Sequence, residues 1–128
     1  MPRKLVSSGS PLEPEIGFSR AVRIGPLVSV SGTAPIKDDG KTASVGDLYG
    51  QTLHCLEIVK AAIEDAGASL DDVIRTRVML TDISAWREAA RAHGDYFRNT
   101  RPACTFFEVS RFIDESWLVE VEADAVIE

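Results

Sequence analysis

A cysteine lies in the stretch RPACTFFEVSRF, residues 101–112, which has the composition of a β-strand. The thiol of Cys104 is a strong nucleophile only as a thiolate, and a thiolate needs a nearby base. His54 and His93 both fall in predicted helices, which we expect to cover the opposite face of the sheet, His54 in solvent and His93 hydrogen-bonded. The pattern therefore does not predict a Cys–His pair, and we expect Cys104 to be a small buried or pocket-lining side chain.

Charged side chains alternate along two other predicted strands. Arg75 and Arg77 lie in one of them, and Glu120 and Glu122 lie in the other. On neighbouring strands these opposite charges would neutralise each other, an interaction that contributes little when it is exposed. A carboxylate in an apolar cleft has instead a raised pKa and can act as a general base on water that attacks a C=N or C=O carbon. The sequence leaves both roles open for Glu120.

The elements that must position these residues follow from hydrophobic periodicity. Helical spacing predicts one helix over 47–66, which Gly67 ends, and a second that Ser84 caps and that ends before Pro102. Residues 1–17 are rich in turn-forming residues, and we expect a loosely ordered N-terminal segment. Alternation or β-rich composition predicts strands over 20–24, 27–31, 73–80, 103–110 and 117–127. This order predicts an α+β fold in which both helices cover one face of a single sheet.

Side-chain alternation assigns the strand residues to two faces. The apolar face, which the helices should cover, collects Ile74, Thr76, Val78, Leu80, Phe107, Val109, Trp117, Val119, Val121, Ala123 and Ala125. The opposite face is mixed and collects Arg75, Arg77, Met79, Cys104, Phe106, Glu108, Leu118, Glu120 and Glu122. The chain has no third layer to cover this mixed face, so we expect self-association.

Composition narrows the class of protein. The 128 residues are 45% hydrophobic and 27% charged, as in an ordinary globular domain, and the net charge is −6. An acidic chain without clustered lysine and arginine repels nucleic-acid backbones, so we expect no nucleic-acid partner. We also expect no membrane segment and a cytoplasmic location, because no signal-like or spanning apolar stretch occurs. The two cysteines have neither metal-ligand spacing nor a disulfide framework.

Four stretches, in order, resemble the Rid family, also called YjgF/YER057c or L-PSP: VSVSGTAP, QTLHCLEIVKAAIEDAGASLDDVIRTRVMLTDI, RPACTFFEVSRF and VEVEADAV. The match runs from about Phe18 to the end of the chain. The resemblance implies one domain over residues 1–128 with a chorismate-mutase-like α+β fold, a six-stranded mixed sheet and two helices on one face. It also implies a homotrimer with small-molecule clefts between subunits. Its deaminase branch hydrolyses reactive enamines and imines without a metal or an organic cofactor.

The resemblance also implies roles for individual residues. Phe18 occupies the position of a pocket aromatic residue, Gly32 that of a glycine beside the ligand, and Glu120 that of the glutamate that places the attacking water. Cys104 stands where the deaminase branch has the arginine that binds the substrate carboxylate. Phe106 stands where that branch often has cysteine, which should make the cleft narrower and more apolar.

The missing arginine leaves several functions open. Arg101 could restore anion binding from the cleft mouth, or it could only help to end the preceding helix.

The first possible function of the protein is an enamine or imine hydrolase in which Glu120 is catalytic and the substrate differs from the standard 2-imino acid. The alternative is a trimer that binds a small metabolite without transforming it. An endoribonuclease is the reading that we favour least, because the predicted cleft contains no pair of histidines.

Overall fold

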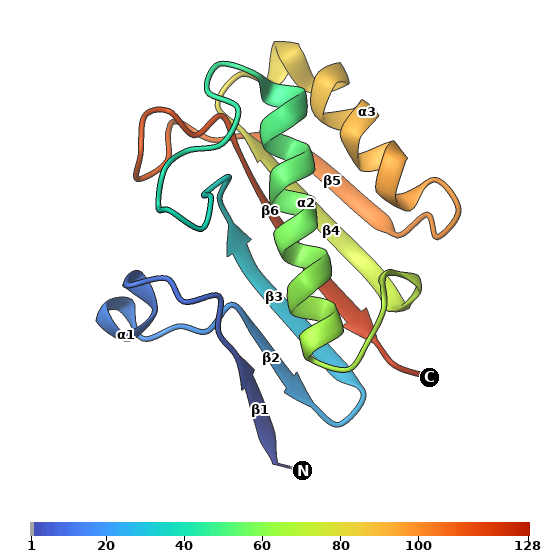
Figure 1. Ribbon diagram of the computed structural model, residues 1–128. Coiled ribbons are helices and arrows are strands. Elements are labelled where there is room, and N and C mark those ends of the chain that lie inside the picture. Colours follow the sequence, from blue (N-terminus) through green and yellow to red (C-terminus); the bar gives the residue numbers. More distant parts are fainter. Residues whose placement is uncertain (1) are drawn as a thin grey trace.

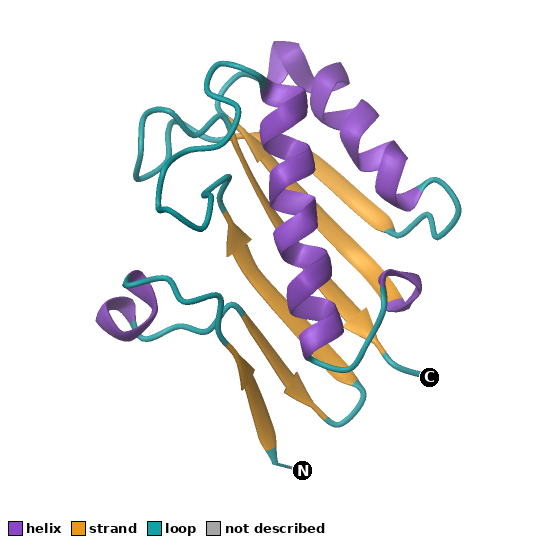
Figure 2. Cartoon of the chain, viewed as in Figure 1, coloured by secondary structure: helices purple, strands orange, loops and turns teal. Residues whose placement is uncertain are grey.

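The computed structural model describes residues 2–128, and its centre is one six-stranded sheet (Figures 1 and 2). The strand order is β1-β2-β3-β6-β4-β5, and all neighbours are antiparallel except β4 and β5, which are parallel. This mixed sheet confirms the predicted fold class. The strands are β1 (Arg3–Val6), β2 (Ala21–Ile24), β3 (Leu27–Thr33), β4 (Val73–Leu80), β5 (Ala103–Glu108) and β6 (Val119–Val126).

Two long helices, α2 (Leu48–Asp65) and α3 (Trp86–Phe97), cover one face of the sheet, as Figure 1 shows. The Asp47 side chain caps α2 by accepting a hydrogen bond from the Gly50 amide. Beyond the end of α2, Gly67 has a φ of 93°, a conformation that glycine adopts without strain. Short 3₁₀ turns at Leu70–Asp72 and Ile83–Ala85 precede β4 and α3.

Strand β6 separates the core from the uncovered face of the sheet. Its residues alternate strictly between buried and half-buried. The buried set is apolar and packs in the core below α2 and α3: Val119, Val121, Ala123 and Ala125. Glu120, Glu122 and Asp124 therefore point to the uncovered face, as the sequence pattern predicted for both glutamates.

On this uncovered face Arg77 forms ion pairs with Glu122 (3.6 Å) and Asp124 (3.2 Å). The predicted neutralisation of opposite charges is therefore confirmed for Arg77 and Glu122. Arg75 instead donates a hydrogen bond to the Thr105 hydroxyl (3.0 Å). No ion pair within residues 2–128 involves Glu120.

The N-terminal segment contains more regular structure than we expected. Residues Arg3–Val6 form β1, which pairs with β2, and Leu12–Ile16 form the short helix α1, which ends at Gly17 (φ 89°). The sequence pattern missed β1 because a four-residue edge strand gives too short an alternation to recognise. In Figure 1, α1 lies beside the sheet, away from α2 and α3.

The prediction of which face β5 presents was wrong. Strand β5 pairs with β4 so that Cys104 lies opposite Thr76 and Phe106 opposite Val78, and both of these β4 residues are buried below the helices. Cys104 and Phe106 therefore share the helix-covered face, whereas Phe107 is on the other face and is 39% exposed. Because the strand has apolar residues on both faces, alternation alone could not assign its direction.

One β4 residue also differs from its predicted face. The register between β4 and β6 shifts between Val73 and Arg75. Val73 is buried in the core, while Ile74, which we expected there, is exposed.

Among residues 2–128, no helix combines the length and apolar composition needed to cross a bilayer.

Candidate functional site

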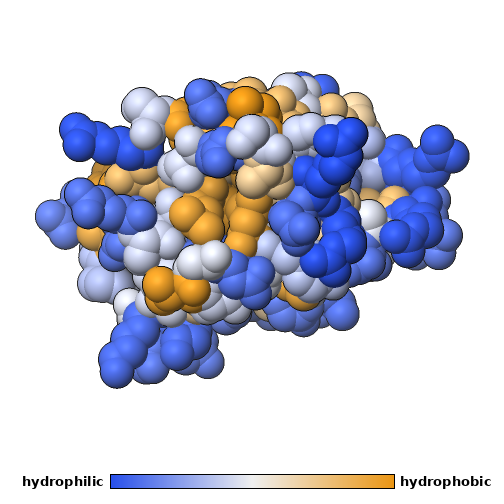
Figure 3. Space-filling view, turned by 90° about the horizontal axis from the view of Figure 1, so that it is seen from above, coloured by the Kyte–Doolittle hydropathy of each residue, from blue (hydrophilic) through white to orange (hydrophobic). Residues whose placement is uncertain are grey.

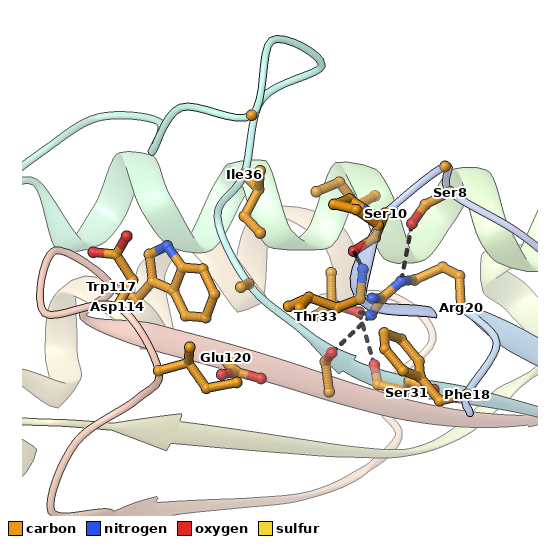
Figure 4. Close-up of a pocket in the computed structure, with 18 of the residues that line it drawn as sticks. Ser8, Ser10, Phe18, Arg20, Ser31, Thr33, Ile36, Asp114, Trp117 and Glu120 are labelled. Carbon is orange, nitrogen blue, oxygen red and sulfur yellow. Dashed lines mark hydrogen bonds between the residues drawn. The ribbon is translucent and has the colours of Figure 1, made fainter. Parts of the chain in front are cut away.

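A pocket of about 920 Å³ lies at the end of the sheet where β3 ends and β6 begins (Figure 4). Its walls come from the segment around α1, the end of β3, the loop that follows it, α2, and the loop before β6. Seen from above, this end of the molecule exposes apolar surface between hydrophilic side chains (Figure 3). The volume falls in the range of small-molecule sites in proteins.

Most of the pocket wall is apolar, and aromatic rings stand at two places. Phe18 lies near the Arg20 end, and Trp117 lies above Glu120 (Figure 4). Ile36 comes from the loop after β3, and Ile58 comes from α2. Such walls suit a ligand with an apolar body and few polar groups.

Glu120 supplies a carboxylate to the pocket. It is half-buried, and no dashed line reaches it in Figure 4. Burial raises its pKa, the Arg20 guanidinium opposes this rise, and the Glu122 carboxylate adds to it. A carboxylate with a raised pKa and a free oxygen can take a proton from water, which is the property of a general base.

Gly32 leaves the space that this carboxylate occupies. A Cβ at position 32 would lie only 3.0 Å from Oε1 of Glu120. The absent side chain therefore lets the Glu120 carboxylate approach the backbone of β3 closely. Gly32 thus makes room for the carboxylate and also lines the pocket, and its position beside a ligand stays a prediction.

Arg20, which the sequence analysis did not select, supplies a positive charge to the same pocket. Its side chain is buried, and Nη1 donates hydrogen bonds to the Gly32 carbonyl (2.7 Å) and to the Thr33 hydroxyl (3.0 Å). Nε donates a longer bond to the Ser8 hydroxyl (3.4 Å). Burial lowers the pKa of this guanidinium, while Glu13 and Glu120 oppose the change. Arg20 precedes β2, where nothing in the strand pattern indicates that it faces a cavity.

The loop before α1 holds Arg20 from the other side. Oε2 of Glu13 accepts hydrogen bonds from the Ser8 amide and hydroxyl (both 3.0 Å) and from the Ser10 amide (3.3 Å). These hydrogen bonds lower the pKa of Glu13, although burial alone would raise it. Ser8 thus connects a buried carboxylate to the arginine, and α1 is fixed to the pocket wall.

Gln51 of α2 fixes the loop that leads into β6. It is fully buried, its Nε2 donates to the Ser116 carbonyl (2.8 Å), and its Oε1 accepts from the Leu118 amide (2.8 Å). Glu120 follows two residues after Leu118, so this clamp sets where β6 enters the pocket. The sequence contained a signal for it in the early glutamine of the QTLHCLEIVK stretch.

The structure brings together three of the residues that the sequence analysis selected. Phe18, Gly32 and Glu120 all line the pocket. Cys104 and Phe106 do not line it, because β5 is the far edge strand and turns both toward the helix layer. Arg101 also lies outside the pocket, in an exposed turn with a φ of 55°.

Cys104 has a different neighbourhood from the one we expected. It faces Thr76, and the Thr76 hydroxyl shares a hydrogen bond with Nε2 of His93 (2.8 Å). The expectation that His93 lies across the sheet from Cys104 was therefore wrong. Cys104 is exposed on the edge strand and does not line the pocket, so the expectation of a buried or pocket-lining side chain was wrong for the single chain. Partial desolvation still raises the pKa of the thiol, although Thr76 and Arg75 oppose this. A raised pKa keeps the thiol protonated and argues against a thiolate nucleophile.

The second histidine supports the pocket loop. The His54 ring makes a hydrogen bond through Nε2 with the Ile36 carbonyl (3.0 Å), so it is not simply solvated. No three His, Cys, Asp or Glu side chains within residues 2–128 are close enough together to hold a metal ion.

The fold and pocket can be compared with known proteins. The family model described as endoribonuclease L-PSP matches residues 9–127. A crystal structure of a member of the highly conserved YjgF/YER057c/UK114 family from Mycobacterium tuberculosis is 45% identical, with a TM-score of 0.89 over 98% of this chain and 100% of that chain. A RutC family protein of Pyrococcus abyssi is 35% identical over 108 residues, 84% of each chain. The chain therefore belongs to the YjgF/YER057c/UK114 family, also described as endoribonuclease L-PSP.

A more distant solved relative carries a ligand in its description. The crystal structure of TdcF from Escherichia coli, solved with bound serine, is 25% identical, with a TM-score of 0.80 over 97% of this chain and 94% of that chain. Family membership confirms the resemblance that the order of the four sequence stretches indicated.

Proposed function

We propose that this protein is a hydrolase that adds water to the C=N carbon of a small imine or enamine held in the pocket. The observation that carries the proposal is the half-buried Glu120 carboxylate, which lines an apolar cavity without an ion pair in residues 2–128. The family resemblance supports this reaction and predicts that no metal or organic cofactor is needed.

In the proposed reaction, Glu120 takes a proton from a water molecule as the water oxygen attacks the imine carbon. Glu120 passes this proton to the nitrogen, which gives a carbinolamine with a new C–O bond. Glu120 then takes the proton of the carbinolamine hydroxyl and passes it to the nitrogen as the C=O bond forms and the C–N bond breaks, so that one imine and one water give one carbonyl compound and one ammonia or amine. An apolar wall around the carbon limits the access of other water molecules.

The proposal includes a homotrimer in which the cleft is shared between subunits. Cys104, Phe106 and Arg101 lie on or next to the far edge strand β5, so they could reach a pocket only from a neighbouring protomer. In that arrangement the place of the deaminase-branch arginine holds a thiol, and a thiol cannot make the paired charge-assisted bonds of a guanidinium. The substrate we propose therefore differs from the standard 2-imino acid in how it is held.

The test is turnover of 2-iminopropanoate and of an uncharged imine, compared with buffer alone. Replacing a general base should lower kcat by about 10²–10⁴-fold, so we expect that loss in Glu120→Gln. Glu122→Gln is the matched control, because Glu122 is ion-paired with Arg77 outside the pocket. If neither imine is consumed faster than in buffer, or if both variants are equally active, the hydrolase proposal is wrong.

A second candidate is a non-catalytic trimer that binds a small metabolite. The apolar walls and the bound serine of the TdcF structure favour it. A ligand that binds only the native state raises the melting temperature with its concentration. If keto acids or amino acids raise the melting temperature and no imine is turned over, this binding function is the correct one. An endoribonuclease finds less support, since the net charge of −6 disfavours binding to RNA.

A further inference from the structure

Arg20 is a buried cation whose charge is not neutralised by direct contact. Arg20 is only 8% exposed, and no ion pair within residues 2–128 includes it. Its hydrogen-bond acceptors, on Gly32, Thr33 and Ser8, are all uncharged oxygens. Glu13 and Glu120 offset part of the cost of burying this charge, but neither forms an ion pair with it, so an anion bound directly to the guanidinium would stabilise it further.

The guanidinium also has donors without a hydrogen-bond partner in residues 2–128, and the residue lines the cavity. Its three hydrogen bonds use Nε and Nη1, so the two N–H groups of Nη2 remain free among the described residues. These hydrogen bonds hold the guanidinium in one orientation. The Arg20 side chain also lines the pocket. Figure 4 shows Arg20 at the end of the pocket near Phe18 and Ser8. A fixed guanidinium with a free edge is well suited to a carboxylate.

Gly32 contacts both this cation and the surroundings of the Glu120 carboxylate. Its carbonyl accepts the hydrogen bond from Arg20, and its Cα is the group that Glu120 approaches. The Phe18 ring lies 5.3 Å from the Arg20 guanidinium carbon, so an aromatic surface adjoins the same charge. One glycine thus connects a site for negative charge to the proposed site of water activation.

The other cations near the pocket are poorer anion sites. Lys37 lines the pocket, but its ammonium is exposed and lies 3.9 Å from Asp39. Arg101 is exposed and outside the pocket. Among the cations near the pocket in residues 2–128, only Arg20 is both buried and held in one orientation by hydrogen bonds.

We infer that the Nη2 edge of Arg20 binds the carboxylate of a small organic acid whose apolar side chain lies against Phe18 and whose electrophilic carbon faces Glu120. Arg20 is thereby the anion site that position 104 lacks, and it belongs to the same protomer as Glu120. This inference deepens the proposed function and rests on it for the role of the ligand. Binding, however, can be measured without turnover.

The experiment compares an acid with its amide by isothermal titration calorimetry. The probes are 4-methyl-2-oxopentanoate, a stable analogue of an imino acid, and 4-methyl-2-oxopentanamide, which has no charge. A hydrogen bond to a charged group contributes about 1.5–3 kcal/mol, so we expect the acid to bind at least about 10-fold more tightly than the amide. Arg20→Lys should weaken acid binding by at least about 10-fold and leave amide binding unchanged.

Arg101→Gln tests the competing anion site, and Arg98→Gln, at an exposed arginine outside the pocket, is the matched control; both variants should bind the acid like the unmodified protein. Equal affinity for acid and amide, no acid binding, or loss of acid binding in Arg101→Gln but not in Arg20→Lys would each overturn the inference. Because Arg20 also supports the fold, circular dichroism must show that its variant is folded. If it is not, a crystal structure of the unmodified protein with the acid decides. A carboxylate within hydrogen-bonding distance of Nη2 supports the inference, and any other position of the carboxylate overturns it.

The outcomes separate this inference from the proposed function. Acid binding that depends on Arg20, without hydrolysis of any imine, would leave the inference intact and make the hydrolase proposal wrong. Hydrolysis of 2-iminopropanoate that depends on Glu120 but proceeds equally in Arg20→Lys would support the hydrolase proposal and make the inference wrong.

Discussion

At the residue scale, the pocket contains a carboxylate whose environment favours its uncharged form. Burial raises the pKa of Glu120, and the opposing effect of Arg20 does not cancel this rise. A group like this lowers the stability of the folded state at neutral pH, because the charged form is better solvated in the unfolded chain. Such a cost is common at sites that are shaped for chemistry.

We therefore predict that Glu120→Gln stabilises the protein at pH 7.5. Since the folded-state pKa of Glu120 exceeds its unfolded value, the folded state binds more protons between the two, and stability falls as the pH rises through this window. Glutamine does not ionise, so its advantage should disappear at pH values below both pKa values. The gain should be less than about 1 kcal/mol, because Glu120 is partly exposed to screening solvent.

Urea unfolding at several pH values measures this effect. Glu122→Gln, which removes an ion pair with Arg77, should give no such gain at pH 7.5. A Glu120→Gln variant that is less stable than the unmodified protein at pH 7.5 would contradict the argument.

A second prediction at this scale concerns Gly32→Ala. The new Cβ would lie 3.0 Å from Oε1 of Glu120, which is closer than most real Cβ contacts, so the carboxylate must move by a few tenths of an ångström. We expect kcat to fall by about 10-fold or more, because catalytic groups must be held within about 0.5 Å of their productive position. The melting temperature should change little, since the end of a flexible side chain can adjust. Unchanged kcat with either imine would show that the close approach has no catalytic role.

At the element scale, strand β6 contributes side chains to both faces of the sheet. Its alternate residues fill the core, and the residues between them carry the charges of the uncovered face. The position where it begins is set by α2 through Gln51, because the side-chain amide nitrogen donates to the backbone of residue 116 and the side-chain oxygen accepts from the backbone of residue 118.

We predict that Gln51→Ala lowers the free energy of unfolding by about 2–6 kcal/mol. The substitution leaves the Ser116 carbonyl and the Leu118 amide without their partner, and each unpaired group that stays buried costs about 1–3 kcal/mol. Glu64→Ala, on the exposed surface of the same helix, is the control and should change the free energy of unfolding by less than about 0.5 kcal/mol. Equal effects of the two substitutions would mean that water replaces the clamp.

The elements also show how far the sequence could be interpreted. Alternation predicted β6 and most of β4 correctly, because each has one apolar and one charged face. It failed for β5, where apolar residues on both faces left the direction to the pairing with β4. Arg20 escaped notice for another reason: its side chain is held by Ser8, Gly32 and Thr33, which lie 12 or 13 residues away in the sequence and so give no local periodic signal.

At the scale of the whole molecule, one face of the sheet lacks a covering layer. Apolar side chains such as Leu27 and Phe107 are exposed. The Nε group of Arg75 is buried without a hydrogen-bond partner in the described part of the chain. Buried polar groups without partners are rare in native proteins, and exposed apolar surface on a sheet is a usual feature of interfaces. Both observations favour self-association, which the sequence analysis expected for the same reason.

We predict that the protein is a trimer in solution and that Phe107→Asp weakens it. The aspartate would place a charge at an apolar position of the interface. Burying that charge costs desolvation free energy, and keeping it in contact with water prevents close packing of the protomers. Either outcome lowers the affinity between protomers. Size-exclusion chromatography with light scattering should give three times the chain mass for the unmodified protein and a lower mass for the variant at micromolar concentration. Val45→Asp, at an exposed apolar residue outside the sheet, is the control and should remain trimeric. If β5 of one protomer adjoins the pocket of another, Phe107→Asp should also reduce turnover in proportion to the loss of trimer. A fully active monomer would show that Phe18, Gly32, Arg20 and Glu120 form a complete site within one chain.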